Sequence, residues 1–453
     1  MNTIVIILLF LQITFIISKY PDNKTNPYFI YNFTTLPFAN ATKEYNETGK
    51  FYAYPSTIRI SPKGDLFVSV PRHVFNNKTI SRSIPGTINQ IKDGLLYPWP
   101  SLEENTYNVG RLGSVVGFEI DLKGRLWLLN HRRKEREVII YNKDGTYFKS
   151  INITTATIHR YHMSYLSNIL LDLQRGFAYI SDTGNIFGNP NDPAKTKSNI
   201  IVLNLENEFA LKILQKDASS KPEVNYEYDD TFKTTIKNIG LYGIALTCDK
   251  KHLYYSPVKS RQMYSLQTYK LQDEHAVRGV DEIQNYTKRF ASFEITSSAR
   301  GILYYTAIDD NSINVNFYER DITFSITRKV GHDKEKNKET LEEYPTSLTF
   351  NGTTGMLFYL VNKHNILLDK DITERIDDKK VNFQIMSVYV NDRSYLYPCN
   401  FFYYMPNHFW VVILVVSLGL AYILIRIIKQ VGKLDKREKI KVKENEDLIG
   451  LDS

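Results

Sequence analysis

The residue patterns that most often mark a catalytic or metal site are scarce in this chain of 453 residues. His159 and His162 form an H-x-x-H pair, which is a zinc-binding type of pair, but no third ligand lies nearby in the sequence. The chain has no G-x-S-x-G, H-E-x-x-H or P-loop motif, and its acidic residues are too dispersed to nominate an acid–base pair. We therefore expect no metal and no other cofactor, and the sequence favours binding over catalysis.

Five other residues are better candidates for a ligand-binding site. They are Asn168, Asp182, Tyr242, Thr346 and Asn362. A small ligand with an aromatic ring and an amine would suit this set, because the ring could stack on Tyr242 and the amine could donate to Asn168, Thr346 and Asp182. Asp182 and Asn362 could also bind Ca²⁺, but the chain has no D-x-D-x-D-G loop. The alternative role for all five is to cap the ends of strands.

These candidates lie beside a repeated pattern that predicts β-hairpins. Each repeat is a strand with period-two alternation, a turn that usually holds glycine, and a second apolar strand. Six such units at a spacing of roughly fifty residues are typical of a radial array. The units are IRISPKGDLFVSV from Ile58, FEIDLKGRLWLLN from Phe118, ILLDLQRGFAYISD from Ile169, IALTCDKKHLYYSP from Ile244, FEITSSARGILYYT from Phe293 and LTFNGTTGMLFYLV from Leu348.

The repeat predicts an all-β domain, a six-bladed β-propeller over residues 51–400. The innermost strands of a propeller line a central channel, so residues just before these strands should gather at one channel mouth. The residues at those positions are Thr57, Gly117, Asn168, Tyr242, Gly243, Ser292, Thr346 and Ser347. A content of 32 Tyr and 24 Phe also favours strands. Unrelated hairpins in a β-sandwich are the alternative.

Both ends of the chain carry apolar runs that predict an address in the secretory pathway. Residues 1–18 have no charged side chain and resemble a signal peptide, although the poor cleavage site leaves an N-terminal anchor as the alternative. Residues 401–428 combine an aromatic belt with an apolar run long enough to cross a bilayer. Lysines and arginines follow in residues 429–453, so the positive-inside rule places this tail in the cytosol.

Glycosylation sequons support this topology. They begin at Asn23, Asn32, Asn40, Asn46, Asn77, Asn152, Asn285 and Asn351, and all precede the apolar run. Four of them fall within an N-terminal arm, residues 19–50, which we expect to be exposed and irregular. We therefore expect a type I membrane glycoprotein of the plasma membrane or the endosomal and lysosomal system.

The cysteine count and the net charge limit the disulfides and the partners that the protein can have. The chain has only two cysteines, and in an oxidising compartment Cys248 and Cys399 are permitted to form a disulfide, with two buried thiols as the alternative. The net charge of +8 is scattered except near the C-terminus, which argues against a nucleic-acid partner.

The tail carries a candidate sorting signal. The segment ENEDLI, with Glu444, Leu448 and Ile449, resembles the acidic dileucine pattern that endocytic adaptors bind. Such a signal needs an apolar pair and an acidic residue on a flexible cytosolic segment. The alternative is a solvated tail with no partner.

Several of these segments resemble the major royal jelly and Yellow protein family. LFVSVPRHVFNNKTISRSIPGTI is similar to the family's FVTVPRW…GVPATL, and SVVGFEIDLKGRLWLLN to SVFRVAVDECDRLWVLD. LYGIALTCDKKHLYYSPVKSRQMYSLQT is similar to GIALSPDGRTLYYSPLSSRRLYSVPT, and VNFQIMSVYVNDRSYLYPC to VNFRILIANVNDLI…C. The resemblance covers roughly residues 51–400 in the family's order and implies a six-bladed propeller.

Three functions are consistent with this resemblance. Some family members bind biogenic amines in the channel, which implies that this propeller binds a small aromatic or amine-like ligand. Other members are linked to dopachrome conversion, a proton-shifting isomerisation that would need a base such as His162, Asp182 or His252. The third function is a cell-surface receptor or adhesion protein that uses the propeller loops.

The chain also departs from the family pattern. Leu122 stands where the family has a cysteine, Asn130 replaces an aspartate, and the membrane anchor is unusual because members are typically secreted.

Overall fold

A computed structural model describes most of the chain. The described residues are 27–72, 82–132, 135–153, 164–184, 198–214, 217–223, 239–272, 282–308, 312–317, 322–325, 344–363, 376–399 and 407–449. They fall into two compact units, Met1–Cys399 and Asn400–Ser453. The predicted signal peptide, Asn23, Asn77, His159 and His162 lie outside the described residues.

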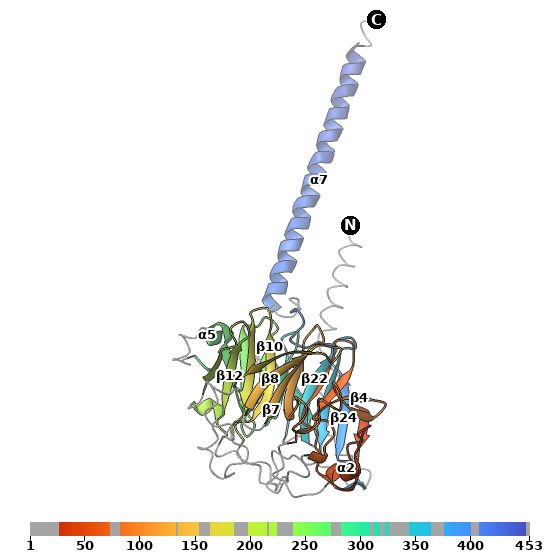
Figure 1. The fold of residues 1–453 in the computed structure, drawn as a ribbon. Coiled ribbons are helices and arrows are strands. Elements are labelled where there is room, and N and C mark those ends of the chain that lie inside the picture. Colours follow the sequence, from red (N-terminus) through yellow and green to blue (C-terminus); the bar gives the residue numbers. More distant parts are fainter. Residues whose placement is uncertain are drawn as a thin grey trace, which may run out of the picture. The chain divides into compact units, whose positions relative to one another are not determined.

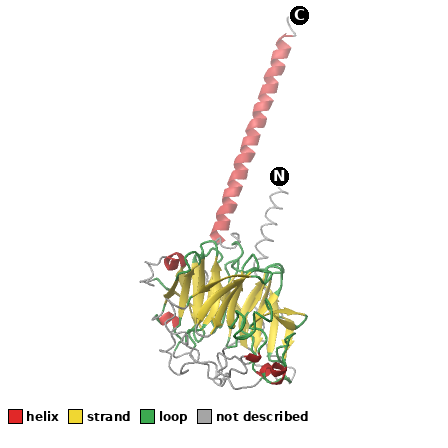
Figure 2. Ribbon diagram, in the orientation of Figure 1, coloured by secondary structure: helices red, strands yellow, loops and turns green. Residues whose placement is uncertain are grey.

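The first unit contains six four-stranded antiparallel sheets, which are the blades of a propeller (Figure 1 and Figure 2). Blade one is β2 (Ile58–Ile60), β3 (Leu66–Ser69), β4 (Ile88–Lys92) and β5 (Leu95–Pro98); blade two is β6 (Ser114–Ile120), β7 (Leu126–Arg132), β8 (Glu135–Tyr141) and β9 (Tyr147–Asn152); blade three is β10 (Leu166–Asp172), β11 (Phe177–Asp182), β12 (Asn199–Asn204) and β13 (Ala210–Ile213); blade four is β14 (Leu241–Leu246), β15 (His252–Pro257), β16 (Gln262–Gln267) and β17 (Gln284–Thr287); blade five is β18 (Ile295–Ser297), β19 (Leu303–Ala307), β20 (Ser312–Phe317) and β21 (Ile322–Ser325); blade six is β22 (Tyr344–Asn351), β23 (Met356–Asn362), β24 (Phe383–Tyr389) and β1 (Tyr28–Phe33). The predicted six-bladed propeller is confirmed.

Blade six closes the ring with strands from both ends of this unit. β1 pairs antiparallel with β24, with Asn32 opposite Gln384 and Phe33 opposite Phe383. The N-terminal arm therefore differs from the irregular segment that we expected. Its aromatic run YFIYNF favours a strand, and α2 (Lys43–Glu47) and the 3₁₀ helix η1 (Gly49–Phe51) follow it. The sequons had indicated exposure correctly, because Asn32, Asn40 and Asn46 are exposed.

Each pair of neighbouring blades shares its own apolar cluster. Ile58 of blade one packs with Ile385 of blade six, and Phe67 of blade one packs with Phe118 of blade two. Similar clusters join blades two and three, three and four, four and five, and five and six. The core is therefore distributed around the ring, so each blade depends on a neighbour on both faces.

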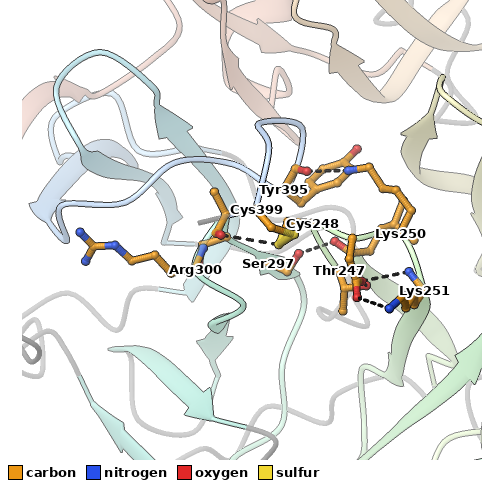
Figure 3. The surroundings of a disulfide bond; sticks show 12 residues. Thr247, Cys248, Lys250, Lys251, Ser297, Arg300, Tyr395 and Cys399 are labelled. Carbon is orange, nitrogen blue, oxygen red and sulfur yellow. Dashed lines mark hydrogen bonds and ion pairs between the residues drawn. A yellow bond between two sulfur atoms is a disulfide. The ribbon is translucent and has the colours of Figure 1, made fainter. Parts of the chain in front are cut away.

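A C-terminal strap, defined here as residues 392–399, continues from β24 over the turns of blades four and five (Figure 3). A disulfide joins its Cys399 to Cys248 in the β14–β15 turn, which confirms the pairing that the sequence permitted. Ser394 bridges Ser298 in blade five, and the Tyr395 amide donates to the Ser297 carbonyl at 3.1 Å. A disulfide of this kind is typical of proteins of the secretory pathway.

The second unit consists of one helix, α7 (Asn407–Ile449). Its segment Val415–Ile440 has 26 residues and a mean hydropathy of 1.6, and it is the one span in the described chain long and apolar enough to cross a membrane. The helix continues to Ile449, so Glu444, Leu448 and Ile449 belong to a helix and not to the flexible segment that a dileucine signal was expected to need. The Lys- and Glu-rich composition of this region explains the helix, since both residues are good helix formers.

Loss of the disulfide should destabilise the propeller. Cys248 and Cys399 are separated by 151 residues, and closing a loop of this length contributes about 4–5 kcal/mol on the chain-entropy model. We expect the Cys248→Ala, Cys399→Ala double variant to melt at a clearly lower temperature than the wild type. A reducing agent should lower the wild-type melting temperature to the same value and leave the double variant unchanged. Equal melting of wild type and double variant would show that the bond contributes nothing.

Candidate binding site on the propeller axis

Three charged side chains from three blades meet on the propeller axis. Arg59 lies in β2, Glu119 in β6, and Glu294 immediately before β18. Arg59 Nη2 contacts Glu294 Oε1 at 2.8 Å, and Arg59 Nε lies 3.6 Å from Glu119 Oε1. All three residues are buried, with exposed fractions of 5%, 8% and 3% respectively. We call these three residues the axial charge cluster.

Backbone and polar groups of other blades complete the cluster. Arg59 Nη1 donates to the carbonyls of Ile58 at 2.8 Å and Leu348 at 3.1 Å. Arg59 Nη2 also donates to Asn168 Oδ1 at 3.2 Å, and the amide of Leu348 donates to Glu294 Oε2 at 2.9 Å. Arg59 therefore links blades one, three, five and six, since a guanidinium has five donors in a fixed geometry.

The axial charge cluster has two carboxyl groups and one guanidinium. Burial raises the pKa of Glu119 even though Arg59 opposes that shift, so the site favours the uncharged form of Glu119 until a further cation is present. Within the described residues, Glu119 Oε2 accepts one long hydrogen bond, from the Tyr395 hydroxyl at 3.4 Å. Glu119 is therefore the member of the cluster with most capacity for a further donor or cation.

A cavity of about 40 Å³ lies against the axial charge cluster. Its wall includes Asn168, Leu122, Phe350, Tyr395 and Tyr397. A cavity needs a volume of roughly 10–15 Å³ to hold one water molecule, so this cavity has room for a few waters or one ammonium-sized group. An aromatic ring would fit only if a wall residue moved.

Tyr395 is the residue of the strap that contacts the axial charge cluster. Its hydroxyl accepts a hydrogen bond from the Leu171 amide at 3.0 Å and donates to Glu119. Lys250 donates to the Tyr395 carbonyl at 2.5 Å, and its Nζ lies 4.5 Å from the centre of the Tyr395 ring. Burial lowers the pKa of Lys250 to about 8. The disulfide, Lys250 and the blade-five turn together hold Tyr395 in place (Figure 3).

Apolar side chains fill the opposite end of the channel, where the inner strands begin. The cluster there contains Val116, Tyr165, Tyr242, Phe293 and Tyr344. Tyr242 packs edge-to-face on Phe293 with ring centres 5.5 Å apart, and burial raises its pKa to about 12. The described cavity is therefore at the other end of the inner strands from the mouth that we predicted.

The structure separates the five predicted ligand residues. Asn168 lines the cavity, whereas Tyr242 belongs to the apolar cluster just described. Thr346 and Asn362 contact each other, with Asn362 Nδ2 3.4 Å from Thr346 Oγ1 and 3.1 Å from the Pro55 carbonyl. Their role as ligand residues stays a prediction.

Asp182 lies inside blade three with its carboxylate occupied by protein donors. These donors are Ser164 Oγ at 2.5 Å, the Tyr165 and Gly184 amides at 3.0 Å each, Asn199 Nδ2 at 3.1 Å and Lys212 Nζ at 3.1 Å. His252, another catalytic candidate, is at the start of β15, and its amide is hydrogen-bonded to Thr247 Oγ1. This arrangement gives both residues structural contacts away from the axial charge cluster.

The axial charge cluster was missed by sequence reasoning, although a signal was present. Arg59, Glu119 and Glu294 each interrupt an apolar inner strand, in IRI, FEI and FEI, and the two FEI segments are equivalent in their blades. A charged residue in such a strand is expected to be buried and paired. The departure at Leu122 places an exposed leucine on the cavity rim, and Asn130 is hydrogen-bonded to the Gly113 amide and Glu137.

Comparisons with known proteins give one family and several solved structures that are similar to the chain. A family model described as major royal jelly protein matches residues 113–399, which is more than half of the chain. Among solved structures, a luciferin-regenerating enzyme is 14% identical with a TM-score of 0.46, covering 77% of this chain and 95% of its own. The gluconolactonase XC5397 from Xanthomonas campestris is 9% identical with a TM-score of 0.45, covering 80% and 94%. No curated protein sequence matches the chain significantly.

Removal of Arg59 should be strongly destabilising. The Arg59→Met variant leaves Glu119 and Glu294 buried without their cation, which typically costs about 3–5 kcal/mol. The matched control is Lys149→Met, because Lys149 pairs with Glu208 at 2.8 Å at the surface, where a pair contributes roughly 0–1 kcal/mol. Urea unfolding should show the difference, and the loss in Arg59→Met should shrink at lower pH as the carboxylates take up protons. Equal unfolding midpoints for the two variants would contradict the buried pairing.

The strap should also make stability depend on pH. Burial raises the pKa of Asp392 from 3.8 to about 6. Since the folded state holds this proton more tightly than the unfolded state, stability should fall as the pH rises from about 4 to 6, by up to roughly 3 kcal/mol. Asp392→Asn should remove this part of the pH dependence in urea unfolding. Above pH 6 the variant should therefore have a higher free energy of unfolding relative to the wild type than it has at pH 4. A stability difference that does not change with pH would exclude Asp392 as the group responsible.

Proposed function

Because the chain belongs to the major royal jelly protein family, we propose that it is a membrane-anchored binding protein whose propeller takes up a small cationic ligand on its axis. The observation that carries the proposal is the second carboxyl group of the axial charge cluster, Glu119, which a bound cation would hold in its ionised form. A cation placed in the cavity would pair with Glu119 in a buried environment, where such a pair is screened less than at the surface.

An amine attached to an aromatic ring is the ligand class that we favour. Its ammonium group matches the size of the cavity beside Glu119, and its ring would need the space that Tyr395 fills. Displaced from Glu119, the Tyr395 ring could itself stack on such a ligand. Binding by this route couples the ligand to movement of the strap.

The membrane anchor and the topology of the protein are part of the same proposal. The apolar segment Val415–Ile440 would cross the bilayer once, and at about 1.5 Å per residue it is long enough to do so. The disulfide and the eight sequons support a propeller on the lumenal or extracellular side. The ENEDLI segment would then lie in the cytosol at the end of α7, and binding of an adaptor to it would require the end of the helix to unwind.

Thermal melting in the presence of amines tests the proposed ligand. The full-length protein, purified in detergent from a secretory host, would be melted with a catecholamine, an indole amine and catechol, which has the ring without the amine. At a concentration one hundred times its dissociation constant, a ligand stabilises the folded state by about 2.7 kcal/mol. We expect the amines to raise the melting temperature and catechol to have little effect.

Two matched variants locate the site. Glu119→Gln should abolish the amine-dependent shift, because the counter-charge is lost. Glu137→Gln is the control, since Glu137 is hydrogen-bonded to Asn130 in blade two and lies outside the cavity wall. A shift that persists in Glu119→Gln would place the ligand elsewhere, and an unchanged melt of folded protein with every amine would favour a receptor that uses its loops.

A further inference from the structure

The outermost strand of each blade presents a sheet edge to its surroundings. β1, β5, β9, β13, β17 and β21 are the last strands in their sheets. An open edge of this kind can pair with a strand of another molecule, so soluble proteins usually protect it. The side chains of all these strands except β21 are described, and they show how each edge is protected.

Two of the edges are protected by the chain itself. The β5 edge is covered, because the Leu96 amide donates to the Pro37 carbonyl and the Ala39 amide donates to the Leu96 carbonyl, both at 2.9 Å. The β13 edge carries an inward-pointing charge, since Lys212 is largely buried and contacts Asp182 at 3.1 Å. Covering segments and inward charges are both common protective devices.

The other three described edges each carry a glycosylation sequon. Asn32 lies in β1, Asn152 ends β9, and Asn285 lies in β17. All three asparagines are exposed. We propose that N-linked glycans on these three residues protect the open blade edges from pairing with a second copy of this chain.

Two of these edges need such protection most, because they also expose aromatic side chains. In β1 the exposed fractions are 62% for Tyr28 and 59% for Phe29, and in β9 they are 42% for Tyr147 and 50% for Phe148. Aromatic residues have high strand propensity, so an edge rich in them favours β-pairing. In β9 the rings are partly covered, since Arg111 lies over Tyr147 and Arg125 over Phe148. Antiparallel pairing of one edge with the same edge of a second copy is self-complementary, which makes a two-fold dimer the natural product. A glycan is bulky and strongly hydrated, and it would block that approach.

The test compares loss of edge glycans with loss of the same number of glycans elsewhere. Thr34→Ala, Thr154→Ala and Thr287→Ala together remove the three edge sequons and leave each asparagine in place. Asn40→Gln, Thr48→Ala and Thr353→Ala remove three sequons away from the outer strands and form the control. Thr→Ser at the three edge positions retains the sequons and should behave like the wild type.

Each full-length protein would be made in a secretory host, purified in detergent and measured by light scattering after size exclusion. We expect the edge variant to shift from the monomer mass to the dimer mass or above as concentration rises, while the control variant stays monomeric. Wild-type protein trimmed with an endoglycosidase that leaves one sugar should associate like the edge variant, which separates lost glycans from a changed sequence.

This inference rests on the proposed secretory topology, and the two can fail separately. Mass spectrometry of the wild type shows first whether the three asparagines carry glycans. Empty asparagines at these three positions with glycans on the other sequons would overturn the inference alone, and a chain with no glycan at any of the eight sequons would count against the proposed topology as well. Occupied asparagines with an edge variant that is folded by circular dichroism and remains monomeric would overturn the inference alone. Equal association of the edge and control variants would also overturn it, because the effect would then be unrelated to the edges.

Discussion

The structure depends on closing a ring in which every blade needs a neighbour on both faces. Blade six meets this requirement by taking β1 from the N-terminal side of the unit and β22 to β24 from the C-terminal side. The apolar cluster around Ile58 and Ile385 can form only after that closure. Since backbone pairing and core formation happen at the same join, the first and last parts of the propeller stabilise each other.

Closure of the ring also brings charged residues from separate blades together on the propeller axis. The axial charge cluster draws on blades that are far apart in sequence, and Arg59 is 235 residues from its partner Glu294. A buried ion pair is weak evidence for stability, because desolvation of the charges offsets much of their attraction. The geometry favours a different role, in which Arg59 fixes the centre of the ring and the surplus carboxylate gives the cavity its polarity. The strap contacts the same cluster, because the Tyr395 hydroxyl donates a hydrogen bond to Glu119.

Local signals predicted the blades well, and long-range contacts explain what was missed. The period-two runs and glycine turns predicted six repeats, since each hairpin is specified within a dozen residues. β1 was taken for part of an irregular arm because its partner, β24, lies at least 350 residues away and no local pattern indicates such a pairing. Asn168 contacts Arg59 on the axis, whereas Asp182 accepts its hydrogen bonds from within blade three, a difference that only the folded chain reveals. The sequence shows a charged residue in each of three apolar segments, at Arg59, Glu119 and Glu294. It does not show that these segments converge, and the pairing depends on that convergence.

The disulfide has a mechanical consequence. Only a short stretch of chain joins Cys399 to the apolar helix, so tension applied to the helix enters the propeller at this cysteine. The disulfide passes that force directly to Cys248 in blade four. The strap and β24 therefore carry little of the force. Without the bond, the same pull would act on the contacts of the strap and then on β24, which pairs with both β1 and β23. The position of Cys399 therefore makes the ring resistant to traction applied at the C-terminal end of the propeller.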